Sequence, residues 1–230
     1  MTRARSRDEI NSVISELHQG AILLDDREVF VHPYIEGSDD EAVDTDHRMA
    51  SIFLKNLRLL MTHDKAAKHV PILIHFYNCG GYWGPGMQIY DAISTCQTYI
   101  TSLLHGDAMS MGSIIPLAGD RVIMMPNARL MIHEGTDGMP EMTIKQIRAW
   151  AKEGEKNLAK SLEIYAEVCA KGVYFKDWST VRIKNFITKQ MNQWEDWIID
   201  AEQAVDFGFA HGILGEKPFE DVESIKKHEG

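Results

Sequence analysis

Residues 70–81 read VPILIHFYNCGG, an apolar run that ends in two polar residues and a pair of glycines. Such a run predicts a strand that is buried on both faces, as in a parallel sheet covered by helices. Gly80 and Gly81 allow the backbone to approach a ligand closely and to direct N–H groups toward it. The alternative is that the two glycines only form a tight turn and bind no ligand. A phosphate-binding loop is not favoured, because the G-x-G-x-x-G spacing and a Lys-Ser/Thr pair are both missing.

Helices and strands alternate on either side of this run. The alternation predicts an α/β fold with a mostly parallel sheet. Two of the expected helices carry further signals. Gly154 weakens the middle of the long amphipathic helix that begins at Thr143, and Asp200 with Gln203 forms a capping-box pattern at the start of another helix. Helices are expected at 8–18, 49–61, 86–100, 143–171 and 201–207, and strands at 28–31, 70–77, 99–104 and 121–125.

Composition limits the classes of protein to which the chain can belong. It has 230 residues, enough for one large domain, with 44% apolar residues and a net charge of −10 that argues against nucleic-acid binding. Three cysteines are an odd number, typical of a reducing compartment. We find neither an apolar run of membrane-spanning length nor a signal-peptide pattern, so we expect a soluble, cytoplasmic protein that contacts no membrane.

A second segment, residues 106–112, reads GDAMSMG and places Ser110 between a short strand and an apolar helix. Unpaired N–H groups at a helix N-terminus can hold a developing oxyanion beside the Ser110 hydroxyl. The alternative is that Ser110 only caps the helix, which is a common role for serine. Pro116 lies inside the same expected helix and should kink it.

A third segment, residues 126–135, reads PNARLMIHEG and ends a strand-like run at His133. A histidine on an apolar strand is often only a hydrogen-bonded core residue. His133-Glu134 lacks the second histidine of a zinc peptidase, and the acidic stretch 36–46 lacks calcium-loop spacing. We therefore expect no metal, and we expect a solvated loop at 36–46.

In this order, the three segments resemble the ClpP family of self-compartmentalising serine proteases. The resemblance is specific from about Ile72 to His133 and returns from Asp196 to Ile213. It implies a ClpP/crotonase-like α/β spiral of β-β-α units with a protruding helical handle. It divides the chain into an N-terminal segment (1–20), a catalytic head (21–135 and 191–215), a handle (136–190) and a C-terminal tail (216–230).

The resemblance also assigns roles to individual residues. It makes Ser110 the nucleophile and His133 its general base. The family's aspartate falls on Asp196, since Asp200 is explained by capping. The N–H groups of Gly80 and Met111 would form the oxyanion hole, and substrate would bind along Gly81 and Tyr82.

The chain departs from the family pattern at several positions. Cys79 stands where the family has proline, with one residue fewer in the turn, and Glu134-Gly135 replaces Gln-Pro after the histidine. The interval from His133 to Asp196 is longer than in typical members, which extends the handle. These departures indicate a divergent member, such as a phage-encoded or plastid-type homologue.

The function that the resemblance implies is serine endopeptidase activity on polypeptides inside a homo-oligomer of stacked rings. An ATP-driven AAA+ unfoldase would supply the substrate, because the chain has no P-loop of its own; no cofactor is implied. One alternative is a catalytically silent structural subunit of such a ring. A less favoured alternative is a crotonase-fold acyl-CoA enzyme, which would leave the Ser110, His133 and Asp196 set unexplained.

Overall fold

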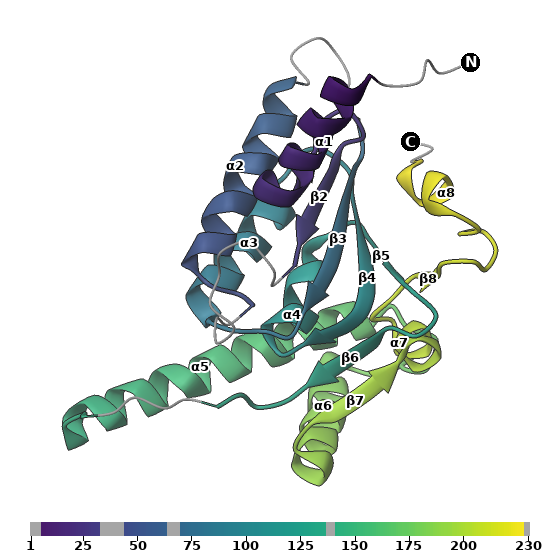
Figure 1. Ribbon diagram of the computed structural model, residues 1–230. Helices are drawn as coiled ribbons and strands as arrows, with labels where there is room; N and C mark the ends of the chain where they lie inside the picture. The colour runs from purple at the N-terminus through teal and green to yellow at the C-terminus, as the bar shows by residue number, and fades with distance from the viewer. Residues whose placement is uncertain (1–5, 33–43, 64–69, 137–140, 228–230) are drawn as a thin grey trace.

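An eight-stranded sheet forms the centre of the computed structural model, which describes residues 6–32, 44–63, 70–136 and 141–227 (Figure 1). The strand order is β1-β2-β3-β4-β5-β8, while β6 pairs with β4 and β7 pairs with β6. All pairings are parallel except β1 with β2 and β6 with β7. The predicted α/β class with a mostly parallel sheet is therefore confirmed. The strands are β1 (Ile22–Leu23), β2 (Glu28–Val31), β3 (Ile72–Asn78), β4 (Ile100–Met109), β5 (Arg121–Met124), β6 (Arg129–Ile132), β7 (Trp197–Asp200) and β8 (Gly212–Ile213).

The helices occupy both sides of the sheet. In Figure 1, α2 and α3 lie along one side, α8 lies on the other, and α5 extends away from the body of the molecule. Among the described residues, no helix combines the length and the apolar character needed to cross a membrane. The helices are α1 (Arg7–Gly20), α2 (His47–His63), α3 (Trp83–Ser94), α4 (Met111–Ile114), the 3-10 helix η1 (Ile115–Ala118), α5 (Ile144–Cys169), α6 (Thr180–Trp194), α7 (Ala201–Phe207) and α8 (Val222–Lys226).

Strand β4 divides the sheet into two branches. Its first half pairs with β5 at residues 101–104, and its second half pairs with β6 at residues 107–109. Gly106 lies between the two halves with a φ of 56°, a conformation that favours glycine. The sequence predicted that this strand ends at residue 104, because local periodicity cannot reveal the second partner. The fork carries the chain from the central sheet to the segment where Ser110 lies.

Side chains of β3 alternate between two hydrophobic clusters, as expected for a strand buried on both faces. Ile72, Ile74 and Phe76 belong to the main core, while Leu73 packs on the opposite face. Ile225 of α8 is fully buried in that second, smaller cluster. The C-terminal helix therefore covers part of the sheet face that α2 and α3 leave open.

Several predicted helix boundaries are confirmed by their caps. Thr143 and Asp200 each form a capping box, and α5 and α7 begin at the next residue. Pro116 was predicted to kink a continuous helix; instead, α4 ends at Ile114 and the chain continues through Pro116 as the 3-10 helix η1. The prediction of a helix to residue 100 was wrong: α3 ends at Ser94, and a turn precedes β4. The acidic stretch 36–46 lies mostly outside the described residues.

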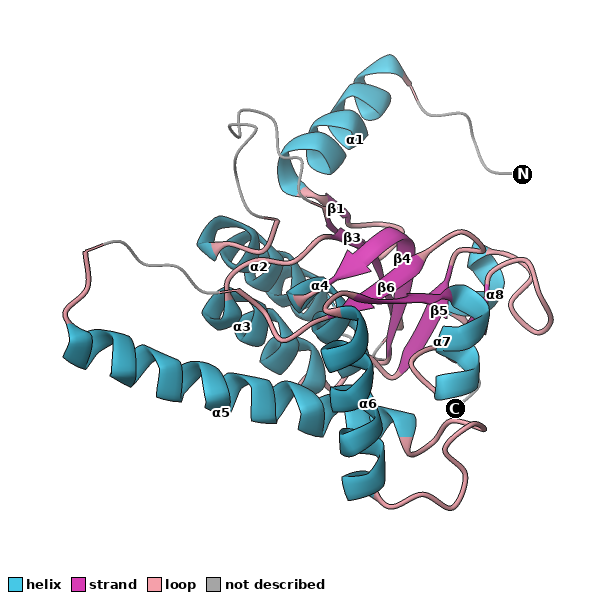
Figure 2. Ribbon diagram, turned by 90° about the horizontal axis from the view of Figure 1, so that it is seen from below, coloured by secondary structure: helices cyan, strands magenta, loops and turns pink. Residues whose placement is uncertain are grey.

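Helix α6 was not predicted, although Ile183, Ile187 and Met191 recur along one face and are buried. It packs against α5, beside an aromatic cluster formed by Tyr174, Phe175, Trp178, Phe186, Trp197 and Phe207. Aromatic and charged residues interrupt the sequence pattern there and hide the helical period. Figure 2 shows α6 beside one end of α5, which anchors that end of the long helix.

Candidate active site

Three strand ends bring Ser110, His133 and Asp196 together. Met109 pairs with Met131 at the parallel ends of β4 and β6, so the next residues of both strands leave the sheet at the same edge. Ile132 pairs with Trp197 across the antiparallel β6 and β7, which places His133 opposite Asp196. Residues far apart in the sequence are thus neighbours because of sheet register alone.

The side chains of these residues are in contact. His133 Nε2 is 2.8 Å from Ser110 Oγ, and His133 Nδ1 is 3.3 Å from Asp196 Oδ1. A carboxylate beside Nδ1 favours the tautomer that carries its proton there, which leaves Nε2 to accept the Ser110 hydroxyl proton. The side chain of His133 is 20% exposed and that of Asp196 is 59% exposed, so water reaches the carboxylate. This arrangement is capable of nucleophilic catalysis.

Ser110 adopts a backbone conformation that L-residues rarely occupy, with φ 53° and ψ −125°. It precedes α4, but its side chain does not cap that helix. The alternative of a simple N-cap serine is therefore not what the structure shows. Backbone strain of this kind costs about 1–3 kcal/mol and persists where surrounding contacts hold it, as at functional sites. Its effect is to direct the hydroxyl toward His133.

The paired glycines pass directly against the Ser110 segment. A Cβ atom at Gly80 would lie 2.7 Å from Ser110 Cβ, and one at Gly81 would lie 2.5 Å from the Thr45 carbonyl oxygen. Both positions also have positive φ. Close approach therefore requires both glycines, as the sequence predicted. Tyr82 follows with 58% exposure, just before α3.

Thr45 and Asn78 hold this turn, and sequence analysis missed both. Thr45 donates its N–H to Gly80 O, and its carbonyl accepts from Tyr82 N–H. The Asn78 side-chain oxygen accepts from the Thr45 hydroxyl and from the Gly80 N–H, each at 2.9 Å. Both side chains are fully buried. The position of Asn78, a polar residue at the end of an apolar strand, was the one sequence feature that could have indicated its role. No feature of the sequence around Thr45 indicated a role for that residue.

Asp196 and Asp200 have different partners. Asp200 Oδ1 accepts from the Gln203 N–H at 2.8 Å, within the capping box of α7. Asp196 lies just before β7, where its carboxylate is free to contact His133. The structure thus brings together the three residues that sequence analysis selected and separates the rival carboxylate from them.

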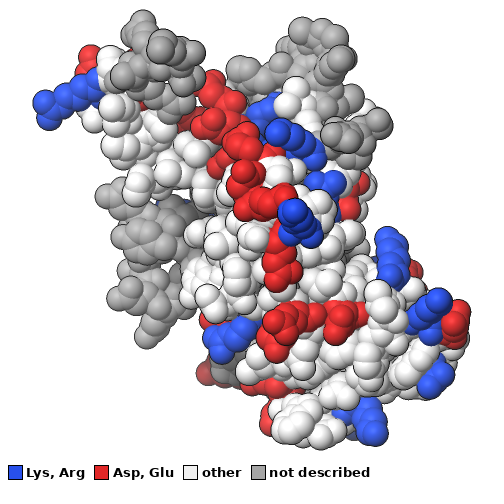
Figure 3. Space-filling model, turned by 90° about the vertical axis from the view of Figure 1, so that its right-hand side faces the viewer, with Lys and Arg blue, Asp and Glu red and all other residues white. Residues whose placement is uncertain are grey.

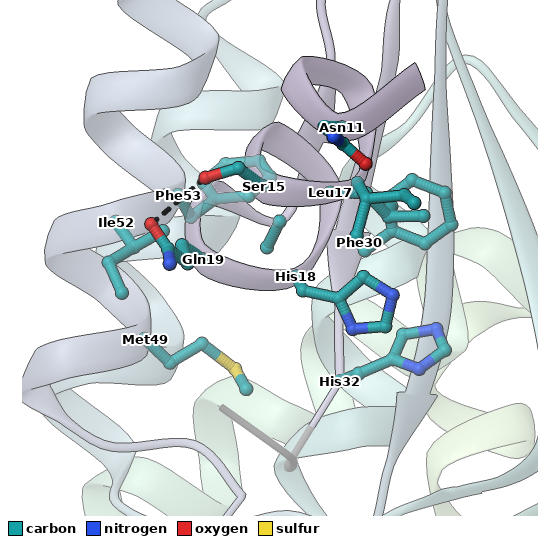
Figure 4. A pocket seen from close by; sticks show the side chains of 12 residues that line it. Asn11, Ser15, Leu17, His18, Gln19, Phe30, His32, Met49, Ile52 and Phe53 are labelled. Carbon is teal, nitrogen blue, oxygen red and sulfur yellow. Dashed lines mark hydrogen bonds between the residues drawn. The ribbon is translucent and has the colours of Figure 1, made fainter. Parts of the chain in front are cut away.

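A separate cavity of about 620 Å³ lies between α1, β2 and α2 (Figure 4). His18 and His32 border it together with apolar side chains such as Phe30 and Met49. None of its lining residues belongs to the Ser110 site. Burial lowers the pKa of His32, whose Nε2 atom has no hydrogen-bond partner among the described residues. This cavity is therefore separate from the Ser110, His133 and Asp196 cluster.

Known proteins resemble the chain over most of its length. A family model described as Clp protease matches residues 22–217. The ATP-dependent Clp protease proteolytic subunit 1 of Protochlamydia amoebophila is 27% identical and covers 96% of this chain and 94% of its own. The ATP-dependent Clp protease proteolytic subunit of Deinococcus radiodurans is 32% identical over 62% of this chain and 64% of its own.

A solved structure shows the same fold. A point mutant of ClpP1 from Listeria monocytogenes superimposes with a TM-score of 0.66 at 21% identity. The match covers 88% of this chain and 96% of that one. The predicted ClpP-like spiral with its helical handle is thereby confirmed.

Proposed function

The chain belongs to the Clp protease family, whose members are peptidases, and on that premise we propose that it is a serine endopeptidase with Ser110, His133 and Asp196 as its catalytic triad. The 2.8 Å contact between His133 Nε2 and Ser110 Oγ supports the proposal most directly. A serine hydroxyl is a weak nucleophile until a base removes its proton, and this contact places the base where it is needed.

The reaction follows from this geometry. Ser110 Oγ attacks the peptide carbonyl carbon while His133 Nε2 takes the hydroxyl proton. The tetrahedral intermediate then collapses, the C–N bond breaks, and His133 returns the proton to the leaving amine. A water molecule next attacks the acyl-enzyme ester while His133 takes its proton. The bond between the carbonyl carbon and Ser110 Oγ then breaks, His133 returns the proton to Ser110 Oγ, and the acid product leaves. Asp196 beside Nδ1 orients the imidazole and stabilises its cationic form.

The oxyanion requires N–H donors, and we assign the first of these to Met111. Met111 is the first residue of α4, so the helix itself provides no acceptor for its N–H group. The Gly80 N–H donates to Asn78 Oδ1 at 2.9 Å, so Gly80 can serve as a second donor only when it leaves that partner. Catalytic hydrogen bonds often form fully only in the substrate complex. Gly81 and Tyr82, beside the same turn, remain our candidates for substrate contact.

We further propose that the substrate is polypeptide, delivered to an oligomeric chamber by an ATP-dependent unfoldase. Both named relatives are described as proteolytic subunits of ATP-dependent proteases. Nucleic acid is a poor alternative, because the face in Figure 3 carries a band of acidic side chains with basic ones interspersed. A phosphate backbone binds to continuous basic surfaces instead.

Labelling with a fluorophosphonate probe tests the chemistry. We expect the wild-type protein to be labelled and Ser110→Ala to remain unlabelled, with His133→Ala strongly slowed. The proposal would be contradicted if the wild type were labelled no faster than Ser110→Ala when both form particles of equal mass. That result would support the alternative of a catalytically silent subunit, which the occupied Gly80 N–H favours.

A further inference from the structure

Two buried hydroxyl groups connect the long helix α5 to the nucleophile segment. Tyr165 Oη of α5 lies 2.7 Å from Ser113 Oγ of α4, and Ser113 Oγ lies 2.7 Å from the carbonyl oxygen of Ser110. Ser113 is 1% exposed and Tyr165 is 3% exposed. Neither residue belongs to the triad, and neither contact is required to form a helix.

The direction of these hydrogen bonds is fixed by the groups themselves. The Ser110 carbonyl can only accept, so the single hydroxyl proton of Ser113 is directed to it. Ser113 Oγ must then accept from the Tyr165 hydroxyl. Burial raises the pKa of Tyr165, so this hydroxyl carries its proton and can donate it. The chain of donors therefore runs from Tyr165 through Ser113 to Ser110.

The carbonyl at the end of this chain belongs to the peptide group that contains the Met111 N–H. A trans peptide is planar, and its C=O and N–H point in opposite directions. Ser110 O accepts two hydrogen bonds from Ser113, one from Oγ at 2.7 Å and one from N–H at 2.9 Å. These bonds fix the peptide plane and therefore also the direction of the Met111 N–H. They also polarise the peptide, which strengthens its N–H as a donor.

We propose that Ser113 and Tyr165 are positioning residues for peptide hydrolysis, which hold the Ser110–Met111 peptide so that the Met111 N–H points at the developing oxyanion. This inference rests on the proposed function. It assigns no contact with substrate to either residue. It also gives the anchored part of α5 a direct connection to the catalytic peptide, since Tyr165 lies on that helix.

A purely structural role is the alternative, because any buried hydroxyl needs a partner. Ser102 provides a matched control for that role. It is fully buried in β4, and its Oγ donates to the Pro116 carbonyl at 3.0 Å. Ser102→Ala and Ser113→Ala thus remove the same kind of hydrogen bond, but only Ser113 is bonded to the Ser110 carbonyl. Tyr165→Phe is a second, milder variant, because it removes one oxygen atom and keeps the ring.

The experiment measures kcat and KM on a short chromogenic peptide, with the fluorophosphonate labelling rate, in assembled protein. We expect Ser113→Ala to lower kcat about 10-fold and Tyr165→Phe about 3-fold, less than the loss of an oxyanion donor itself, with KM unchanged. The double variant should lose no more than Ser113→Ala, since the two hydroxyls act in series. Ser102→Ala should keep the wild-type kcat.

A peptide aldehyde inhibitor provides a readout specific to the oxyanion. Its inhibition constant should rise by the same factor as kcat falls, because its adduct occupies the oxyanion hole. Equal kcat values for Ser113→Ala and Ser102→Ala, with a labelled wild type, would overturn this inference alone. A wild type that is not labelled would overturn the proposed function and the inference together. Should Ser113→Ala not fold, Tyr165→Phe decides: an unchanged kcat would overturn the inference.

Discussion

Asp196 and Asp200 stand four positions apart, and their carboxylates have different partners, His133 Nδ1 and the Gln203 N–H. The same substitution at both positions therefore separates catalysis from capping. We expect Asp196→Asn to lower kcat about 100-fold, because an amide can favour the wrong imidazole tautomer and does not stabilise the imidazolium. Asp200→Asn should change little, since asparagine caps helices about as well as aspartate. Peptide hydrolysis at pH 7.5 measures both variants, and equal losses would contradict the assignment.

Cys79 lies in the glycine turn that packs against Ser110, and its thiol is held in the protonated form. Although Cys79 is an exposed residue, partial desolvation of its thiol and the nearby Asp44 carboxylate raise the pKa of Cys79 to about 11. Because only the thiolate reacts, iodoacetamide should alkylate Cys79 slowly at pH 8. Asp44→Asn should accelerate the reaction several-fold by lowering this pKa. Mass spectrometry of the modified peptide follows the rate, with Cys79→Ser identifying the peptide, and an unchanged rate in Asp44→Asn would refute the electrostatic cause.

The resemblance to the ClpP family was sufficient to select the three catalytic candidates, but not the residues that support them. Ser110 and His133 lie in the motifs that carry this resemblance, and the family's aspartate falls on Asp196, since capping explains Asp200. Thr45 and Asn78 organise the glycine turn through hydrogen bonds between segments that are 33 positions apart. No local pattern predicts such a contact, because it depends on how the segments pack.

At the scale of elements, helices with clear caps were predictable and long-range strand pairing was not. The capping boxes at Thr143 and Asp200 fixed the starts of α5 and α7. The length of β4 depends on its second partner, β6, which the chain reaches only after α4, η1 and β5. Helix α6 was hidden because aromatic residues, which pack on several neighbours at once, blur the helical period.

A cluster of titratable side chains on one face of β2, β3 and β4 should make the stability of the fold depend on pH. His75 lies between His105 at 2.9 Å and Glu28 at 3.2 Å, and Lys226 pairs with the other Glu28 oxygen. Burial, with the charges of His75 and His32, lowers the pKa of His105 to about 4. The hydrogen bond from His75, with Lys226, lowers the pKa of Glu28 to about 2 although burial opposes this.

Both shifts make the unfolded chain bind more protons than the folded one. The free energy of unfolding should therefore fall as the pH drops, first from 6.5 toward 4 through His105 and then from 4.5 toward 2 through Glu28. After allowance for partial exposure, we expect His105 to account for about 1–2 kcal/mol. His105→Gln should reduce the change of the urea-unfolding midpoint between pH 7 and pH 5. The control variant His47→Gln, at an exposed position, should leave that change as it is in the wild type. A wild-type midpoint independent of pH would contradict this prediction.

At the scale of the whole molecule, one end of α5 projects from the body (Figure 1). Apolar side chains on this end are exposed and have no cover from the described residues. Ile144 is 69% exposed, Ile147 is 52% exposed and Trp150 is 46% exposed, at a spacing that places them along one side of the helix. Contiguous apolar surface of this kind usually marks an interaction site. The C-terminal part of α5 is buried against the body of the molecule, whereas none of the described residues covers these three side chains at its other end.

The projecting helix should therefore be buried by other copies of the chain, and native mass spectrometry tests this. We expect particles whose mass is a multiple of 26.1 kDa, and we expect Ile147→Glu combined with Trp150→Glu to shift them to smaller species, because buried unpaired charges are costly. Ala149→Glu, exposed on the other side of α5, is the matched control and should leave assembly intact. A wild-type monomer at working concentration would exclude the chamber. It would leave the proposed chemistry of Ser110 open to its own test, since the three proposed catalytic residues lie within one chain.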